Sequence, residues 1–125
     1  MGSETSAPFP RPLLRTILRF VRRNLDAKLT WVDMAAHVGI ERHAFGRRFK
    51  RTTGLTPRQY VIRKRLRRAK ALLAGRDASV AQVALDVGCS CQSHLTTLFR
   101  QHLDTTPAAY RRRAAARRHL FAAVR

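Results

Sequence analysis

Acidic residues and cysteines are scarce in this chain, and each scarcity excludes a class of protein. Of 125 residues only 7 are Asp or Glu, against 26 Lys or Arg, which gives a formal net charge of +19. The sequence offers no carboxylate pair, no glycine-rich phosphate loop and no Ser/His/Asp set, so we expect no catalytic residue and no enzyme. Its 2 cysteines, Cys89 and Cys91, cannot form a disulfide framework, which favours a reducing compartment.

Long apolar runs are also missing. The longest stretch poor in charge, residues 85–100, contains Asp86 and falls short of the roughly 20 apolar residues that cross a membrane. Residues 3–12 are polar and proline-rich, unlike the apolar region of a signal peptide. We therefore expect a cytoplasmic, nucleoid-associated protein with no membrane partner. Hydrophobic residues still make up 45% of the chain, enough to bury a core, which argues against a disordered basic tail.

Positive charge is abundant and unevenly placed. Between Arg42 and Arg76 there is no acid, and these 35 residues hold 13 of the 26 basic residues. Smaller basic clusters lie near the two ends, at Arg11, Arg15, Arg19, Arg22 and Arg23, and at Arg111, Arg112, Arg113, Arg117 and Arg118. A GC-rich genome, whose proteins are rich in Arg and Ala, explains the excess of Arg over Lys but not the shortage of acids. Nucleic acid is therefore the first candidate partner.

The two halves of the chain repeat each other. Residues 30–39 align with residues 79–88 at an offset of 49, and each copy begins at a Thr or Ser that can cap a helix and ends at Gly. Gln82 is predicted to complete a capping box with Ser79. Apolar residues recur at helical spacing in both copies, at Trp31, Met34, Ala35 and Val38, and at Val80, Val83, Ala84 and Val87.

The repeat continues at an offset of 50 through a second helix and a Thr-Pro pair that begins a third. Each copy is typical of a helix-turn-helix unit, so we expect an all-α fold of two such subdomains joined by a long helix. We predict a flexible tail over residues 1–9, subdomains over 10–56 and 76–118, a linker helix over 57–75, and a C-terminal tail over 119–125. A helix of that length extends about 25 Å and would separate two recognition helices.

In a helix-turn-helix the second helix enters the major groove, so the face opposite its core residues contacts DNA. In the first unit Phe45 and Phe49 point inward, and Arg47 is the strongest candidate for contact with guanine. In the second unit Leu95, Leu98 and Phe99 point inward and the outer face is less charged. The predicted base-contacting residues are His43, Gly46, Arg47, Gln92, Ser93, Thr96 and Thr97. The predicted phosphate contacts are Arg42, Lys50, Arg51, Arg100, Gln101 and Arg111.

Three weaker patterns favour simpler explanations. The five histidines share no metal-ligand spacing with Cys89 and Cys91, so we expect no metal and no cofactor. A redox role for the two cysteines is conceivable, although small residues that fill a turn are the simpler interpretation. The start of the chain matches the loose myristoylation pattern, which also arises by chance or from cloning.

About 100 of the 125 residues resemble the DNA-binding domain of AraC/XylS-family transcriptional regulators. The matching residues are Ala35, Gly39, Phe49, Lys50, Gly54, Leu55, Thr56, Pro57, Tyr60, Arg65, Leu66, Ala69, Leu72, Leu73, Ala84, Gly88, Phe99, Pro107, Tyr110 and Arg111. The resemblance implies a monomeric bacterial activator whose two recognition helices enter successive major grooves of an asymmetric site of about 20 base pairs. It also implies contact with RNA polymerase. The size is similar to the stand-alone MarA/SoxS type, or to a domain of a longer protein.

The chain departs from the family pattern at Arg48, where an apolar residue is usual, and at Cys89, where an aromatic is usual. Glu41 stands where Ser caps the helix, and Asp104 where Gly is common. No target sequence can therefore be carried over. A largely nonspecific, charge-driven DNA-binding protein is the alternative interpretation. A DNA-repair methyltransferase and a membrane-active helix over residues 107–125 are less favoured alternatives.

Overall fold

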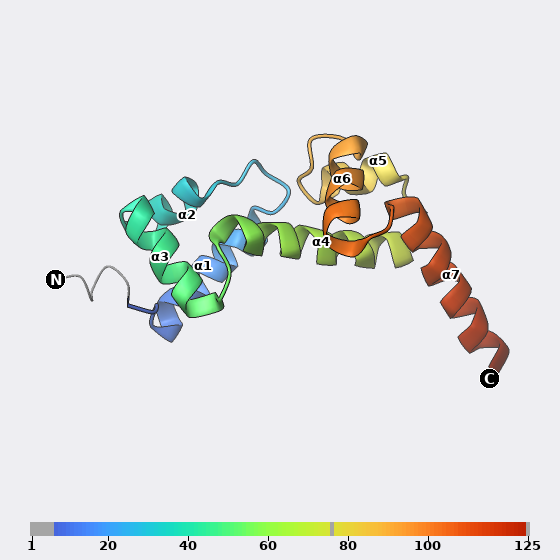
Figure 1. Ribbon diagram of the computed structural model, residues 1–125, viewed down its shortest axis with the longest axis horizontal. Helices are drawn as coiled ribbons and strands as arrows, with labels where there is room; N and C mark the ends of the chain where they lie inside the picture. Colours follow the sequence, from blue (N-terminus) through green and yellow to red (C-terminus); the bar gives the residue numbers. More distant parts are fainter. Residues whose placement is uncertain (1–6, 76, 125) are drawn as a thin grey trace. The chain divides into compact units, whose positions relative to one another are not determined.

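The computed structural model describes residues 7–75 and 77–124, and within them it contains seven helices and no strand (Figure 1). The expected all-α fold is confirmed. The helices are α1 (Arg11–Arg23), α2 (Trp31–His37), α3 (Arg42–Thr53), α4 (Pro57–Gly75), α5 (Val80–Asp86), α6 (Gln92–Leu103) and α7 (Pro107–Val124). None of the helices in these ranges is long and apolar enough to cross a membrane. The lipidation pattern at the start of the chain lies outside the described residues.

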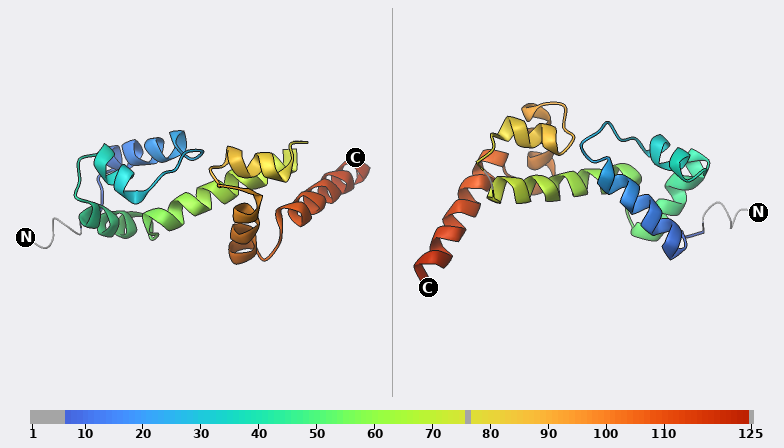
Figure 2. Two further views of the ribbon diagram at one scale, coloured as in Figure 1. Left: turned by 90° about the horizontal axis from the view of Figure 1, so that it is seen from above. Right: turned by 180° about the vertical axis from the view of Figure 1, so that it is seen from behind.

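The chain divides into two compact units, and the boundary between Arg63 and Lys64 lies inside α4. The helix predicted over residues 57–75 is thus a single helix whose first part belongs to one unit and whose second part belongs to the other. In the first unit α2 packs against α1 and α3, and in the second α6 packs against α5 and α7 (Figure 2). Each unit has the helix-turn-helix order that the repeat predicts.

The first unit is built around the aromatic rings of α3. Phe45 and Phe49 are completely buried, with ring centroids 5.7 Å apart, and Tyr60 of α4 meets Phe49 edge-on at 5.4 Å. Ile17 of α1 and Met34 of α2 belong to the same buried cluster. Burying large aromatic and aliphatic side chains removes apolar area from water at roughly 25 cal/mol per Å². This cluster therefore fixes which face of α3 points inward.

Residues 7–9 pack against α3, which corrects the prediction of a flexible tail through residue 9 for these three residues. Phe9 is buried 5.4 Å from the Phe45 ring, and its backbone N–H donates to Thr52 Oγ1 at 2.8 Å. Arg48 Nε donates to the Ala7 carbonyl at 2.9 Å, and the guanidinium lies 4.7 Å from the centroid of the Phe9 ring. A cation over an aromatic face is a favourable contact, which explains an arginine at a usually apolar position.

The two helix-turn-helix turns have the same backbone geometry. Gly39 and Gly88 have φ of 68° and 88°, left-handed values that glycine adopts without a steric penalty. The N–H of the next residue reaches back five positions in each copy, from Ile40 to the Ala35 carbonyl at 3.0 Å and from Cys89 to the Ala84 carbonyl at 2.9 Å. This bond is typical of a helix that ends at glycine. The internal repeat is therefore a repeat of structure as well as of sequence.

The helix caps differ between the copies in one respect. Thr30 and Asp33 form a reciprocal capping box at α2, with bonds of 3.2 and 3.0 Å between side chain and backbone. At α5 Ser79 Oγ accepts from the Gln82 N–H at 3.1 Å, but the Gln82 side chain donates to Asp86 Oδ1 at 2.8 Å. The predicted capping box with Gln82 was wrong because a carboxylate one helical turn ahead attracts its amide.

The second unit buries Leu95, Leu98 and Phe99 of α6, as the pattern predicts, and Tyr110 of α7 meets Phe99 edge-on at 6.0 Å. Phe99 and Tyr110 repeat the pair formed by Phe49 and Tyr60. α6 ends at Asp104, whose φ of 52° lies in the left-handed region that Gly54 occupies at the end of α3. Aspartate adopts the left-handed conformation more readily than most residues other than glycine. It can therefore replace the glycine that is common at this position in the family.

α7 continues beyond the predicted end of the subdomain at residue 118 and reaches Val124. No glycine or proline follows Pro107, and alanine and arginine are strong helix formers, so nothing in the local sequence stops the helix. Leu120 and Phe121 are 65% and 67% exposed in this extension. The predicted C-terminal tail over residues 119–125 is therefore helical through residue 124.

We expect the substitution Phe9→Ala to lower the free energy of unfolding of the first unit by about 3–5 kcal/mol, because it removes a buried aromatic ring. Trp31, the single tryptophan of the chain, lies in this unit and reports its unfolding by fluorescence in a denaturant titration. Val32→Ala is the control in the same unit, since Val32 is 40% exposed and should change little. Equal effects of the two substitutions would contradict the assigned burial of Phe9.

Candidate nucleic-acid interface

α3 presents a basic outer face. Arg42, His43, Arg47, Lys50 and Arg51 are all exposed, while Ala44, Phe45 and Phe49 are buried on the opposite side. Because the helix repeats every 3.6 residues, the burial of the aromatic pair directs these cationic side chains away from the core of the first unit. The predicted exposure of the outer face is therefore confirmed. The contacts that these side chains make with DNA stay a prediction.

Glu41 organises the N-terminus of α3. Its two carboxylate oxygens accept from the backbone N–H groups of His43 and Ala44 at 3.0 and 2.9 Å. These backbone hydrogen bonds, with a smaller contribution from the imidazole of His43, lower the pKa of Glu41 from 4.5 to about 2. A glutamate therefore provides the cap that serine commonly provides at this position.

Glu41 also holds the imidazole of His43, a link that the sequence analysis missed. Oε1 of Glu41 lies 2.9 Å from His43 Nδ1, and the Trp31 ring lies 5.8 Å from the imidazole, centroid to centroid. When Nδ1 carries the proton it donates to the carboxylate, which leaves Nε2 as the free ring nitrogen. The signal in the sequence is a glutamate two positions ahead of a histidine at a helix start. The pair fixes how His43 is oriented on the outer face of α3.

Gly46 lies on the outer side of α3 between these polar residues, and it is half-buried. A Cβ atom built on its backbone would meet nothing within 4 Å. Packing within the protein therefore does not require glycine here, although glycine costs roughly 1 kcal/mol relative to alanine inside a helix. An absent side chain lets a helix backbone approach an external surface more closely.

α6 presents a mostly neutral outer face. Gln92, Ser93, Thr97, Arg100 and Gln101 are exposed, and Thr96 is half-buried beside them. Amides and hydroxyls both donate and accept hydrogen bonds, whereas the arginines and lysine of α3 only donate. The outer faces of α3 and α6 thus differ in chemistry although the two helices occupy the same place in their units.

The two cysteines lie in different surroundings at the start of α6. Cys89 is buried, and this burial raises the pKa of its thiol, while Arg65 acts in the opposite direction. Cys91 is exposed at the N-cap, and the backbone N–H of His94 is the largest of the causes that lower its pKa. Cys89 therefore fills the turn, as the simpler interpretation predicts. Among the described residues no group of three or more His, Cys, Asp or Glu side chains could hold a metal ion.

Arg111 is the one predicted phosphate contact whose guanidinium is already engaged within its unit. Nε donates to the Leu73 carbonyl at 3.2 Å, and Nη2 donates to the Ala78 carbonyl. These bonds connect α7 to the end of α4 and to the segment that leads into α5. Two of the five N–H donors of the side chain are thereby used, and the residue is half-buried.

A family profile described as "Helix-turn-helix domain" matches residues 34–113, from α2 into α7. The HTH-type transcriptional activator RhaS of Klebsiella pneumoniae is 33% identical over 94 residues, which are 75% of this chain and 34% of that protein. The regulatory protein PocR of Salmonella typhimurium is 33% identical over 108 residues, which are 86% of this chain and 36% of that protein. The chain spans about a third of the length of these curated relatives.

Solved structures agree with the sequence relatives. The DNA-binding domain of AdpA, described as the global transcriptional factor and solved in complex with a target DNA, has a TM-score of 0.81 and 34% identity. That match covers 87% of this chain and 97% of the other. A transcriptional regulator from Chromobacterium violaceum has a TM-score of 0.76 and 31% identity, over 84% of this chain and 94% of the other.

We expect the stabilising effect of Glu41 to depend on pH. A carboxylate whose pKa is lower in the folded than in the unfolded state stabilises the fold above its unfolded pKa and loses that effect as the pH falls. The difference in Tm between the wild type and Glu41→Ala, measured by circular dichroism, should be constant near neutral pH. It should shrink between pH 4.5 and about 2, the pKa in the fold. Asp26→Ala removes an exposed carboxylate outside the cap, and an equal pH dependence in that variant would refute the assignment.

Proposed function

The chain belongs to the AraC/XylS family of DNA-binding domains, and from that membership we propose that it regulates transcription by sequence-specific binding to double-stranded DNA through α3 and α6. The observation that carries the proposal is the outer face of α3. It combines a cluster of exposed cations with a capped N-terminus and a buried aromatic face that sets its orientation. A recognition helix in a major groove needs these same properties.

On α3 the base contacts are assigned to His43, Gly46 and Arg47, and the phosphate contacts to Arg42, Lys50 and Arg51. Arg47 is exposed at the middle of the helix, where a guanidinium can donate to guanine O6 and N7 together. His43 is held by Glu41, which leaves one ring nitrogen for a base edge. Lysine and arginine near the helix end suit phosphate, which positions the protein without specifying sequence.

On α6 the base contacts are assigned to Gln92, Ser93, Thr96 and Thr97. An amide pairs well with adenine, and a threonine methyl can contact the methyl group of thymine. Arg100 and Gln101 are assigned to phosphate. Arg111 is kept as a secondary phosphate contact, because its remaining donors would have to act while two carbonyls hold its guanidinium.

The different outer faces of α3 and α6 favour an asymmetric DNA site. One chain carries two helix-turn-helix units, so a monomer suffices, with a site of about 20 base pairs spanning two helical turns. By family membership the regulator is an activator that contacts RNA polymerase; RhaS is itself named a transcriptional activator.

A largely nonspecific DNA-binding function is the second candidate. It is favoured by the net charge of +19 and by the nearly neutral outer face of α6. Counterion release would then supply most of the affinity, with a steep dependence on salt and little dependence on sequence.

Selection of bound duplexes from a random library near physiological salt tests the proposal. We expect a bipartite, non-palindromic motif whose parts lie about one helical turn apart. The substitution Arg47→Ala should then cost about 1–3 kcal/mol of binding free energy on the selected site and relax the preference at one or two base pairs. Binding free energies come from fluorescence anisotropy with the selected duplex and with a scrambled duplex.

Arg19→Ala is the matched control, because Arg19 is an exposed arginine of the same unit that lies on α1. It should change both affinities equally and by little. A library that yields no motif would replace the specific regulator by the nonspecific candidate. Equal small losses on both duplexes for Arg47→Ala would remove Arg47 from the base contacts.

Gly46→Ala should move stability and affinity in opposite directions. The fold has room for the added methyl group, so the variant should gain up to about 1 kcal/mol of stability from helix propensity. The same methyl group should lower affinity for the selected duplex if the backbone of α3 lies close to the groove. Thermal unfolding and anisotropy measure the two effects. Unchanged affinity in a stabilised variant would show that Gly46 does not contact DNA.

A further inference from the structure

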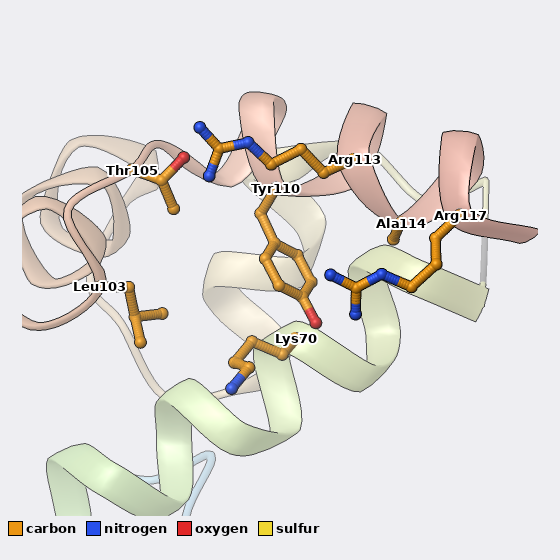
Figure 3. Close-up of a pocket in the computed structure, with 7 residues that line it drawn as sticks. All are labelled: Lys70, Leu103, Thr105, Tyr110, Arg113, Ala114 and Arg117. Atoms are coloured by element: carbon orange, nitrogen blue, oxygen red, sulfur yellow. The ribbon is translucent and has the colours of Figure 1, made fainter.

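The second unit contains a cavity of about 220 Å³ between α4 and α7 that the DNA-binding proposal does not use (Figure 3). Three cationic side chains line it, Lys70 from α4 and Arg113 and Arg117 from α7. Figure 3 shows the ring of Tyr110 descending from α7 towards α4, with its hydroxyl between Lys70 and Arg117. Thr105 contributes a second hydroxyl to the lining.

The positive charge of this cavity is not compensated within the described part of the chain. No carboxylate there forms an ion pair with Lys70, Arg113 or Arg117, and the nearby Asp104 does not line the cavity. Figure 3 shows the guanidinium of Arg117 near the Tyr110 hydroxyl and Lys70, whereas the guanidinium of Arg113 lies near Thr105. Neighbouring cations without a counter-charge repel one another, and an anion between Lys70 and Arg117 removes that repulsion. The cavity therefore has the electrostatics of an anion site.

The donors around the cavity identify the class of anion. A guanidinium forms paired, charge-assisted hydrogen bonds with phosphoryl oxygens, and an ammonium group adds a point charge. The hydroxyl of Tyr110 supplies a further donor between Lys70 and Arg117. Donors on two helices can contact several oxygens of a tetrahedral group, whereas a planar carboxylate has only two. The remaining lining is apolar, from Leu103 and Ala114.

We propose that this cavity binds a phosphoryl group, through Lys70, Arg117 and the hydroxyl of Tyr110. The group comes either from a small phosphorylated compound or from the backbone of DNA. Bound there, it would join α7 to α4 within the second unit. The proposal goes beyond the proposed function and does not depend on it, because phosphate binding can be measured without DNA.

Titration of the ¹⁵N-labelled protein with inorganic phosphate, at constant pH and ionic strength maintained with chloride, tests this site by NMR. We expect saturable shifts confined to the amides around Tyr110 and to the Nε signal of Arg117. Lys70→Met and Arg117→Gln should each weaken phosphate affinity about tenfold, the loss expected for one charge-assisted hydrogen bond. Arg118→Gln is the matched control, since Arg118 is exposed on the same helix and does not line the cavity.

Duplex DNA distinguishes the two sources of the phosphoryl group. If DNA supplies it, a duplex shifts the same signals, phosphate competes with the duplex, and Lys70→Met lowers the salt dependence of binding on all sequences alike. If a small compound supplies it, the phosphate shifts persist with a duplex bound and Lys70→Met leaves duplex affinity unchanged. Either result supports the site. Shifts that do not saturate, spread over all basic faces and persist in both variants would overturn it.

Discussion

The outer faces of α3 and α6 depend on the burial of a few apolar side chains on the opposite side of each helix. Phe45 and Phe49 anchor α3, and Leu95 and Phe99 anchor α6, all without solvent exposure. Only one rotation of the helix about its own axis buries such an apolar stripe. The contacts that bury the stripe therefore also fix the direction of every other side chain on the helix. Packing thus decides where the polar residues point, and it leaves their chemical identity unconstrained.

That freedom explains how one scaffold carries two different surfaces. The turns at Gly39 and Gly88 and the aromatic pairs Phe49–Tyr60 and Phe99–Tyr110 are the same in both units. The outer faces are not, since α3 is rich in arginine and lysine while α6 carries amides and hydroxyls. Divergence is concentrated at positions that contribute little to the cores. A single chain can therefore combine two chemically distinct contacts without a partner subunit.

The helices and their inward faces were predictable because both depend on local patterns, namely apolar periodicity, caps and the glycine and Thr-Pro boundaries. Features that depend on contacts between residues distant in sequence could not be predicted in this way. Phe9 is buried by residues of α3 more than thirty positions away, and the cavity joins Lys70 to Arg113 and Arg117. The Gln82 side chain had two competing partners that a motif cannot rank. The apolar periodicity predicted that the candidate DNA-contacting side chains are exposed. Which of them contacts a base and which contacts a phosphate depends on how each helix lies on the DNA, and the sequence does not determine this.

The attachment of residues 7–9 to α3 gives the first unit a direct path for transmitting force to that helix. The Ala7 carbonyl and the Phe9 N–H are bonded to Arg48 and Thr52, so the incoming chain is fastened to α3 rather than only to α1. A force or rearrangement that acts on the backbone of residues 7–9 reaches the candidate DNA-contacting helix through two hydrogen bonds and the contacts of the Phe9 ring with Phe45, Arg48 and Phe49. A displacement of residues 7–9 can therefore be transmitted directly to α3, without passing through the turn between α2 and α3.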